Sequence, residues 1–245
     1  MNYYIYDGSF PGLLTAIYDA FYSNEKPDKI STVEFYQQGL FDNKIKIETD
    51  LNKSDRVYQA VKDKISLNSL RRVYNAYLSE EEGIASLILK YLILGFKMGK
   101  EIDDFLNNDI VNQICRVSSR VSKEKHLLLG LLRFKEIKNG VYYAPFEPDY
   151  NITSLIAPHF SKRLSDQDWI IHDRKRKIAA IYNKEEWVIT EMDNPEKIII
   201  SEDEEFYQQL WKGFYKNIAI EERKNSTLQR QFMPKRYWKY LIEKY

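Results

Sequence analysis

Cations and aromatic rings are concentrated in residues 229–240, called here the closing segment, which reads Gln-Arg-Gln-Phe-Met-Pro-Lys-Arg-Tyr-Trp-Lys-Tyr. Arginine and lysine side chains neutralise phosphates, and tyrosine and tryptophan rings stack on nucleobases. From Lys216 onward the sequence holds eight cations and three anions, a net charge of +5, whereas the whole 245-residue chain carries only +1. The positive charge is therefore segregated, which predicts a surface that binds nucleic acid.

A second cluster of cations follows Asp173 at residues 174–177. The β-prone residues on both sides predict a hairpin turn. A basic turn is equally typical of a solvated surface, but one basic patch results if the closing segment packs beside it. The phosphate contacts are then expected from Arg174, Lys175, Arg176, Arg230, Lys235 and Arg236, with Tyr237 or Trp238 stacking on bases.

Acid–base chemistry would depend on histidine, of which the chain has three. His159 lies one helical turn before Arg163, and His172 directly precedes Asp173. A histidine beside a carboxylate can act as a general acid or a general base, so His159, His172 and Asp173 are candidate catalytic residues. The alternative is a structural histidine at the end of a strand. The spacing matches no metalloprotease motif, and we predict neither a metal nor a cofactor.

The predicted long helix of residues 108–137 carries His126, Gly130 and Arg133 at helical spacing. Gly130 leaves a gap through which a ligand can approach the backbone. His126 is a further candidate catalytic residue. The alternative is that the polar face of this helix is merely solvated and that His126 packs in the core against a strand. We expect a cleft lined by His126, Arg133, His159 and Arg163.

The single cysteine, Cys115, excludes an internal disulfide, an iron–sulfur cluster held by this chain alone and a cysteine-rich zinc site. The N-terminal residues lack the basic and apolar regions of a signal peptide. Residues 84–98 are apolar almost all round but shorter than the roughly 20 residues of a spanning helix. We therefore expect a buried core helix, no membrane contact and a cytoplasmic protein.

The predicted elements change near Gly140, from mainly helices to mainly strands. The expected fold is α+β, with an antiparallel sheet, a meander in the C-terminal half and a large helical portion. We expect one domain, residues 1–245, with a possible subdivision into 1–139 and 140–245. Helical patterns cover residues 13–22, with Ser9 as cap, 54–64, 66–78, 84–98, 108–137, 152–164 and 201–219, with Ser201 and Glu204 as a capping box. Strand patterns cover residues 3–6, 41–49, 141–144, 169–172, 178–182 and 187–190.

Several stretches together resemble the bacterial family described as probable DNA metabolism or putative DNA repair proteins, built on a domain of unknown function. They are residues 6–18, beginning Tyr-Asp-Gly-Ser-Phe-Pro-Gly, 124–134, 148–152, 157–160, 169–173 and 229–239. The resemblance covers nearly the whole chain in order.

What the resemblance implies is a partnership. Such proteins are typically encoded beside a radical-SAM protein thought to modify or repair DNA, and some relatives are fused to a uracil-DNA glycosylase domain. At 245 residues this chain is expected to be the form without that fusion. The family brings no established catalytic residues to carry over.

The leading hypothesis is a DNA-binding accessory protein that works with a radical-SAM enzyme and is not itself catalytic. One alternative is an enzyme acting on DNA or nucleotides, which would bring His159 and His172 together in a cleft. The other is a protein–protein adaptor, which would expose an apolar patch.

Overall fold

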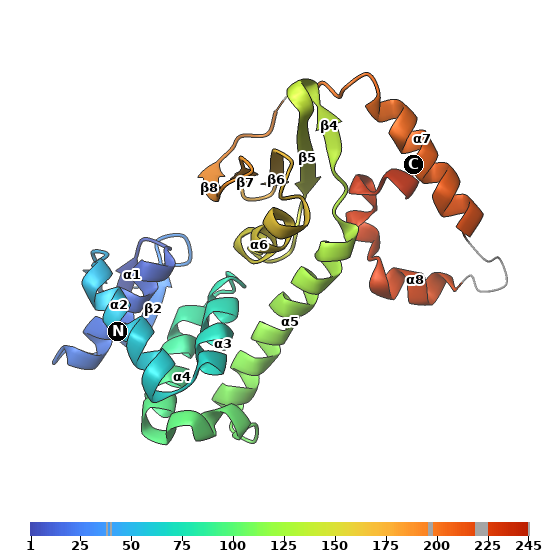
Figure 1. Cartoon of the computed structure of the whole chain (residues 1–245). Helices are drawn as coiled ribbons and strands as arrows, with labels where there is room; N and C mark the ends of the chain where they lie inside the picture. Colours follow the sequence, from blue (N-terminus) through green and yellow to red (C-terminus); the bar gives the residue numbers. More distant parts are fainter. Residues whose placement is uncertain (38, 40, 196–197, 219–224, 245) are drawn as a thin grey trace. The chain divides into compact units, whose positions relative to one another are not determined.

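The computed structural model describes residues 1–37, 39, 41–195, 198–218 and 225–244 (Figure 1). The contacts of the chain divide it into two compact units, unit 1 at residues 1–122 and unit 2 at residues 123–245. Three residues used in the sequence analysis lie outside the described residues. They are Ala219, the predicted end of a helix, and Arg223 and Lys224, two of the eight cations counted from Lys216 onward. The subdivision at residue 139 stays a prediction.

Unit 1 begins with β1 (Asn2–Tyr6), the central strand of a three-stranded parallel sheet in the order β2-β1-β3. The predicted cap is confirmed, because the Ser9 hydroxyl accepts a hydrogen bond from the Gly12 amide at 2.9 Å at the start of α1 (Phe10–Tyr22). β3 (Asn43–Lys46) lies within the predicted strand, whereas β2 (Lys29–Thr32) has too short a pattern to be predicted. α1 is the crossover that parallel β1 and β2 require.

The helices of unit 1 bury their apolar faces against this sheet and one another. α4 is the predicted core helix, since Ile88, Tyr91 and Leu92 are completely buried. No helix among the described residues has the length and apolarity to cross a membrane. The helices are α2 (Leu51–Lys64), α3 (Leu67–Tyr77), α4 (Ile84–Met98), the 3-10 helix η1 (Gly99–Asp104) and α5 (Asp109–Leu131), which continues into unit 2.

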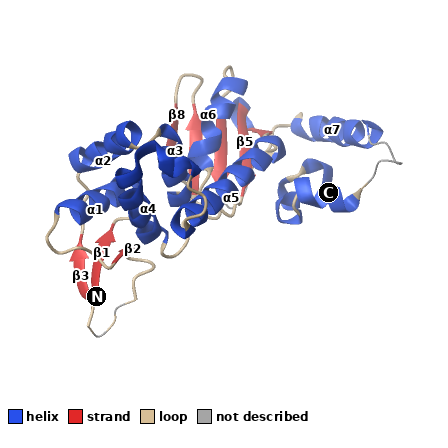
Figure 2. Cartoon of the chain, turned by 90° about the horizontal axis from the view of Figure 1, so that it is seen from below, coloured by secondary structure: helices blue, strands red, loops and turns tan. Residues whose placement is uncertain are grey.

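Unit 2 contains a mixed five-stranded sheet in the order β4-β5-β6-β7-β8 (Figure 2). β6 (Trp169–Asp173), β7 (Ile178–Tyr182) and β8 (Trp187–Glu191) form the predicted antiparallel meander. The expectation of an entirely antiparallel sheet is wrong, because β5 (Val141–Phe146) runs parallel to β6. The helix α6 (Thr153–Arg163) lies between them in the chain and supplies the crossover.

The predicted helix of residues 108–137 is too long. α5 ends at Leu131, and β4 (Lys135–Ile137) follows and pairs antiparallel with β5. Phe134, in the connection, packs edge-on against Phe160 of α6 at 5.1 Å between ring centroids. This contact needs the chain to leave the helix, and η2 (Lys138–Gly140) then turns it into β5.

The predicted capping box at Ser201 is also wrong. α7 (Glu204–Ile218) begins three residues later, and the Ser201 hydroxyl has no hydrogen-bond partner among the described residues. The Glu204 carboxylate accepts a hydrogen bond from the Glu136 amide at 2.9 Å instead, so the start of α7 is fastened to β4. The remaining elements are α8 (Ser226–Phe232) and the 3-10 helices η4 (Lys235–Tyr240) and η5 (Ile242–Lys244).

We expect Gly12→Ala to destabilise unit 1. A Cβ atom there would lie 2.1 Å from Asp7 Oδ1 and 2.9 Å from Thr49 Oγ1. Asp7 cannot yield freely because Ser9 and Thr49 both donate to its carboxylate. The expected loss is roughly 1–3 kcal/mol of unfolding free energy, measured by urea denaturation. Gly130→Ala is the control, because a Cβ at this helical glycine meets nothing within 4 Å and should add up to about 1 kcal/mol. Equal effects of the two changes would contradict the packing argument.

Candidate nucleic-acid interface

The loop after β5, residues 147–150, contacts both predicted basic clusters. Arg176 Nη2, from the hairpin turn between β6 and β7, donates to the backbone carbonyl of Asp149 at 2.8 Å. Arg236 Nη2, from the closing segment, lies 3.0 Å from the Asp149 carboxylate. The hairpin turn and the closing segment are therefore neighbours, as the single-patch hypothesis requires. That this surface binds nucleic acid stays a prediction.

Glu147 makes the second connection between this loop and the closing segment. Its carboxylate accepts hydrogen bonds from Lys239 Nζ at 2.5 Å and from the Tyr240 hydroxyl at 2.6 Å. Burial pushes the pKa of Glu147 upward, but these two hydrogen bonds outweigh it and hold the pKa below its usual value. The acids of the loop thus neutralise part of the positive charge that the sequence places here.

Asp173 organises the hairpin turn from the inside. It is completely buried, and Oδ1 accepts hydrogen bonds from the amides of Lys175 at 3.0 Å and Arg176 at 3.2 Å. Oδ2 accepts from Arg176 Nη1 at 2.9 Å, and the Arg176 side chain is only 11% exposed. Burial raises the pKa of Asp173, against the pull of the Arg176 charge. The pair therefore holds the turn, and the roles of Asp173 as an acid–base group and of Arg176 as a phosphate contact stay predictions.

Tyr237, one of the two residues predicted to stack on a base, has a buried side chain. Its ring is 2% exposed, and its hydroxyl donates a short hydrogen bond to the Glu124 carboxylate of α5. Burial, and then the bond to Glu124, raise the pKa of Tyr237 well above its usual range. The neighbouring Trp238 is half-buried, and its indole donates to the Met233 carbonyl at 2.8 Å. Trp238 is therefore the remaining candidate for stacking.

Several predicted cations have no carboxylate partner among the described residues. Lys175 Nζ donates to the Asp149 carbonyl at 3.2 Å, and Arg174 Nε to the amide oxygen of Asn194 at 3.2 Å. Lys235 Nζ lies 5.9 Å from the centroid of a Trp238 ring. Arg230 bonds within its own helix, to the Ser226 carbonyl and the Thr227 hydroxyl. Within the described part of the chain, no ion pair is seen for Arg174, Lys175, Arg230, Lys235 or Lys244, although the charge of Arg174 helps to lower the pKa of Glu147.

The candidate acid–base histidines do not form one site. His172 is completely buried, with Nδ1 2.7 Å from the Tyr143 hydroxyl and Nε2 3.1 Å from the Met192 carbonyl oxygen. Burial lowers the pKa of His172, which favours the neutral ring over the charged one. His159 is exposed on α6 and packs edge-on against Phe160. Both ring nitrogens of His172 have partners, which fits the structural alternative, and its catalytic role stays a prediction.

Two of the four predicted cleft residues do line one cavity. Arg133 and Arg163 share a cavity of about 530 Å³ with Gly130, at the end of α5. Arg133 is already paired, since Nη2 lies 2.6 Å from the Glu243 carboxylate and the guanidinium covers the Trp211 ring. His126 is exposed, which removes the core alternative, but neither it nor His159 is among the lining residues.

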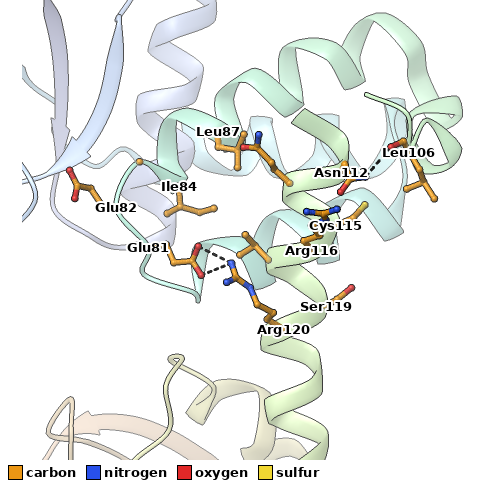
Figure 3. A pocket seen from close by; sticks show the side chains of 13 residues that line it. Glu81, Glu82, Ile84, Leu87, Leu106, Asn112, Cys115, Arg116, Ser119 and Arg120 are labelled. Atoms are coloured by element: carbon orange, nitrogen blue, oxygen red, sulfur yellow. Dashed lines mark hydrogen bonds and ion pairs between the residues drawn. The ribbon is translucent and has the colours of Figure 1, made fainter. Parts of the chain in front are cut away.

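A larger cavity, of about 890 Å³, belongs to unit 1 and lies between the start of α4 and α5 (Figure 3). Figure 3 shows the Arg120 guanidinium turned toward Glu81, whose carboxylate oxygens lie 2.8 and 3.0 Å away. Cys115, Arg116 and Ser119 lie along the α5 side of the same cavity. Of its charged lining residues, Glu81 and Arg120 already form an ion pair with each other.

The sequence analysis missed the acids that organise the interface. Glu124, only 3% exposed, accepts hydrogen bonds from the amides of Asp149 and Tyr150 at 2.8 and 2.9 Å as well as from Tyr237. Glu243 was overlooked in the same way. The available signal was Glu124 at the head of the motif of residues 124–134, since a carboxylate buried beside an apolar run needs partners.

The comparison with known families gives one match, which spans this interface. The domain of unknown function DUF4130 matches residues 82–243. The chain belongs to the DUF4130 family. The match contains all of unit 2 up to Glu243, with Glu124 and the hairpin turn, and leaves the parallel sheet of unit 1 outside. No curated protein matches the chain.

In this DUF4130 protein we expect Glu243→Gln to lower stability in a pH-dependent way. Burial raises the pKa of Glu243, but hydrogen bonds from Arg133 and Trp211 outweigh it and hold the pKa below its ordinary value of 4.5. A depressed carboxyl pKa stabilises the fold above the unfolded pKa, and that contribution is lost as the pH falls through the folded pKa. The variant should unfold more easily by roughly 1–3 kcal/mol at pH 7, and the deficit should shrink below pH 4.5.

Urea denaturation at several pH values between about 3 and 7 measures this deficit in unfolding free energy. Glu205→Gln, at an exposed position of α7, is the control and should follow the wild type throughout. A deficit that is constant with pH would show that the Glu243 carboxylate charge does not stabilise unit 2.

Proposed function

We propose that this protein is a nucleic-acid-binding accessory protein of DNA repair or DNA metabolism. One observation carries the proposal: the hairpin turn and the closing segment meet at Asp149, whose carbonyl accepts from Lys175 Nζ and Arg176 Nη2 and whose carboxylate pairs with Arg236. Lys175 and Lys235 are exposed, and Trp238, three residues after Lys235, is half-buried. Proteins that bind single-stranded nucleic acid combine cations that contact the phosphates with aromatic rings that stack on the bases.

The proposed partner is the radical-SAM protein implied by the sequence resemblance, and the proposed compartment is the cytoplasm. An accessory role agrees with the positions of the titratable candidates, because Asp173 and His172 are completely buried with their polar atoms occupied. In such a partnership the DUF4130 protein would hold DNA and the radical-SAM protein would perform the chemistry.

Binding to DNA should weaken steeply with salt. Each phosphate contact releases condensed counterions and contributes about −0.9 to the slope of log K against log salt on duplex DNA. Replacing Arg174, Lys175 and Lys235 together by Ala should flatten this slope by roughly two to three units. Fluorescence anisotropy with a labelled oligonucleotide, titrated at several salt concentrations, measures it.

The matched control removes the same charge elsewhere. Lys26, Lys62 and Lys90 are exposed cations of unit 1, and their joint replacement by Ala should leave the slope within about half a unit. If both triple variants change the slope equally, the attraction comes from net charge and the junction at Asp149 is not the binding site.

A further inference from the structure

A cavity of about 850 Å³ lies among α1, α2 and α4 of unit 1. This volume falls within the roughly 300–1,000 Å³ that is usual for the binding sites of small organic molecules. Polar and charged side chains of α2 line the cavity together with four aromatic rings, those of Tyr18, Phe21, Tyr22 and Phe96. It is called here the α1–α2 groove.

The aromatic rings of the α1–α2 groove form two pairs. Tyr18 and Tyr22, one turn apart on α1, have ring centroids 4.5 Å apart and ring planes 32° from parallel. Phe21 packs edge-on against Phe96 of α4, with 5.5 Å between ring centroids. The Tyr22 side chain is nevertheless 76% exposed, so most of its ring faces solvent. A planar heteroaromatic ligand can therefore stack in this groove.

Arg56 brings a positioned guanidinium to these rings. Its Nη1 atom donates to the Tyr18 hydroxyl at 3.1 Å, and the guanidinium carbon lies 5.8 Å from the centroid of the Tyr18 ring. Arg120 and Arg133, which line the other cavities, each pair with a glutamate. Among the residues that the structure describes, no carboxylate pairs with Arg56. Its remaining N–H groups are therefore available to an anionic ligand, and their fork matches the geometry of a phosphate.

The charge of the groove lining also favours an anion. Lys64, about two turns beyond Arg56 on α2, is an exposed second cation, and Asp55 is the one acid of the lining. Two cations against one acid leave the lining with a net positive charge. Lys62 and Lys64 lie in the last turn of α2, where they offset the partial negative charge of the helix end.

Two amides and a carboxylate complete the polar side of the groove. Asn52 and Gln59 are exposed, and each side-chain amide offers both a donor and an acceptor, as the edge of a nucleobase does. Asp55 can accept a hydrogen bond from a sugar hydroxyl, as acids of nucleotide sites characteristically do. The lining thus has a partner for each part of a nucleotide, which are the base, the sugar and the phosphate.

We propose that the α1–α2 groove binds a free nucleotide, with the base stacked on Tyr22 and the phosphate held by Arg56 and Lys64. An inorganic anion would leave the rings unused, and an uncharged aromatic molecule would leave the two cations unused. α1 and α2 precede residue 82, where the DUF4130 match begins, so this site belongs mainly to the part of the chain outside the match. The inference does not depend on the proposed DNA binding, because the residues of the groove all lie in unit 1.

Isothermal titration calorimetry of the full chain with AMP, GMP, CMP and UMP tests the site. At least one of these ligands, each of about 20–24 non-hydrogen atoms, should bind with a Kd on the order of 10–100 μM. Arg56→Ala should weaken binding on the order of 10- to 100-fold, because it removes charged hydrogen bonds to the phosphate. Tyr22→Ala should weaken it on the order of 10-fold through lost stacking.

The matched controls are Arg71→Ala on α3 and Tyr58→Ala on α2. Arg71 is exposed, the Tyr58 side chain is 39% exposed, and neither residue lines the groove. Both controls should bind as the wild type does. If none of the four nucleotides binds at about 1 mM, or if the controls lose as much affinity as the groove variants, the proposal is overturned.

The nucleoside without its phosphate separates the two roles. It should bind the wild type on the order of 10-fold more weakly than the monophosphate does, and Arg56→Ala should abolish this difference. Tyr22→Ala should weaken nucleoside and monophosphate by the same factor, because the base is common to both. A preference for the monophosphate that survives Arg56→Ala would contradict the assignment of the phosphate.

A single-stranded oligonucleotide distinguishes this groove from the proposed DNA site of unit 2. Arg56→Ala should leave the salt dependence of oligonucleotide binding and the thermal unfolding measured by circular dichroism unchanged. Nucleotide binding by a protein that does not bind the oligonucleotide would support this inference while the proposed function fails. Oligonucleotide binding that requires Arg56, with no binding of the monophosphates, would assign the groove to a DNA strand and overturn the free nucleotide.

Discussion

The buried Glu124 carboxylate is the constraint on which the arrangement of unit 2 depends. A carboxylate that is 3% exposed needs hydrogen-bond donors, because leaving it unpaired in a dry interior costs several kcal/mol. The donors come from two distant parts of the chain, the amides of the 147–150 loop and the Tyr237 hydroxyl. One side chain of α5 therefore fixes both the loop after β5 and Tyr237 of the closing segment, and the basic turn and the basic closing segment meet as a result.

The acidic partners in this arrangement leave fewer cations available to bind an anion than the sequence suggests. Counting cations along the chain gives a strongly basic C-terminal region, but Arg176, Arg236 and Lys239 each have an acidic partner in space. These pairs position the segments, and the attraction for an anion is left to a smaller set of ammonium and guanidinium groups. Because exposed ion pairs are weak, those of Arg236 and Lys239 can open toward a competing phosphate at little cost. The pair of Arg176 with the buried Asp173 cannot.

Local chemistry predicted the local structure of this protein well. Ser9 capped its helix, the charged run after Asp173 formed a turn, and the apolar residues 84–98 formed a core helix. These features depend on neighbours in sequence. The direction of β5 did not follow, since an alternating pattern identifies a strand but not the strand it pairs with. The end of α5 was misjudged because the residues beyond Leu131 also fit a helical pattern. The contact between Phe134 and Phe160, which takes the chain out of the helix, cannot be read from that pattern.

The candidate site shows the same difference between features set by neighbours in sequence and features set by distant residues. The neighbouring positions of the two basic clusters and the shared cavity of Arg133 and Arg163 were predicted from residue type. The burial of Tyr237, His172 and Asp173 was not, because burial is set by partners far away in the chain. A tyrosine in a basic aromatic segment has the same appearance in sequence whether its ring faces a base or a buried glutamate.

The closing contacts also bear on synthesis. Tyr237, Lys239 and Glu243 reach back over 92 to 113 residues to partners on α5 and beside it. When the five-stranded sheet of a nascent chain has left the ribosome, these three residues have not yet emerged. Glu124 and Arg133 then have no access to their partners in the closing contacts. Domains form in the order in which their residues emerge, which makes unit 2 one that completes its fold only when these residues leave the exit tunnel.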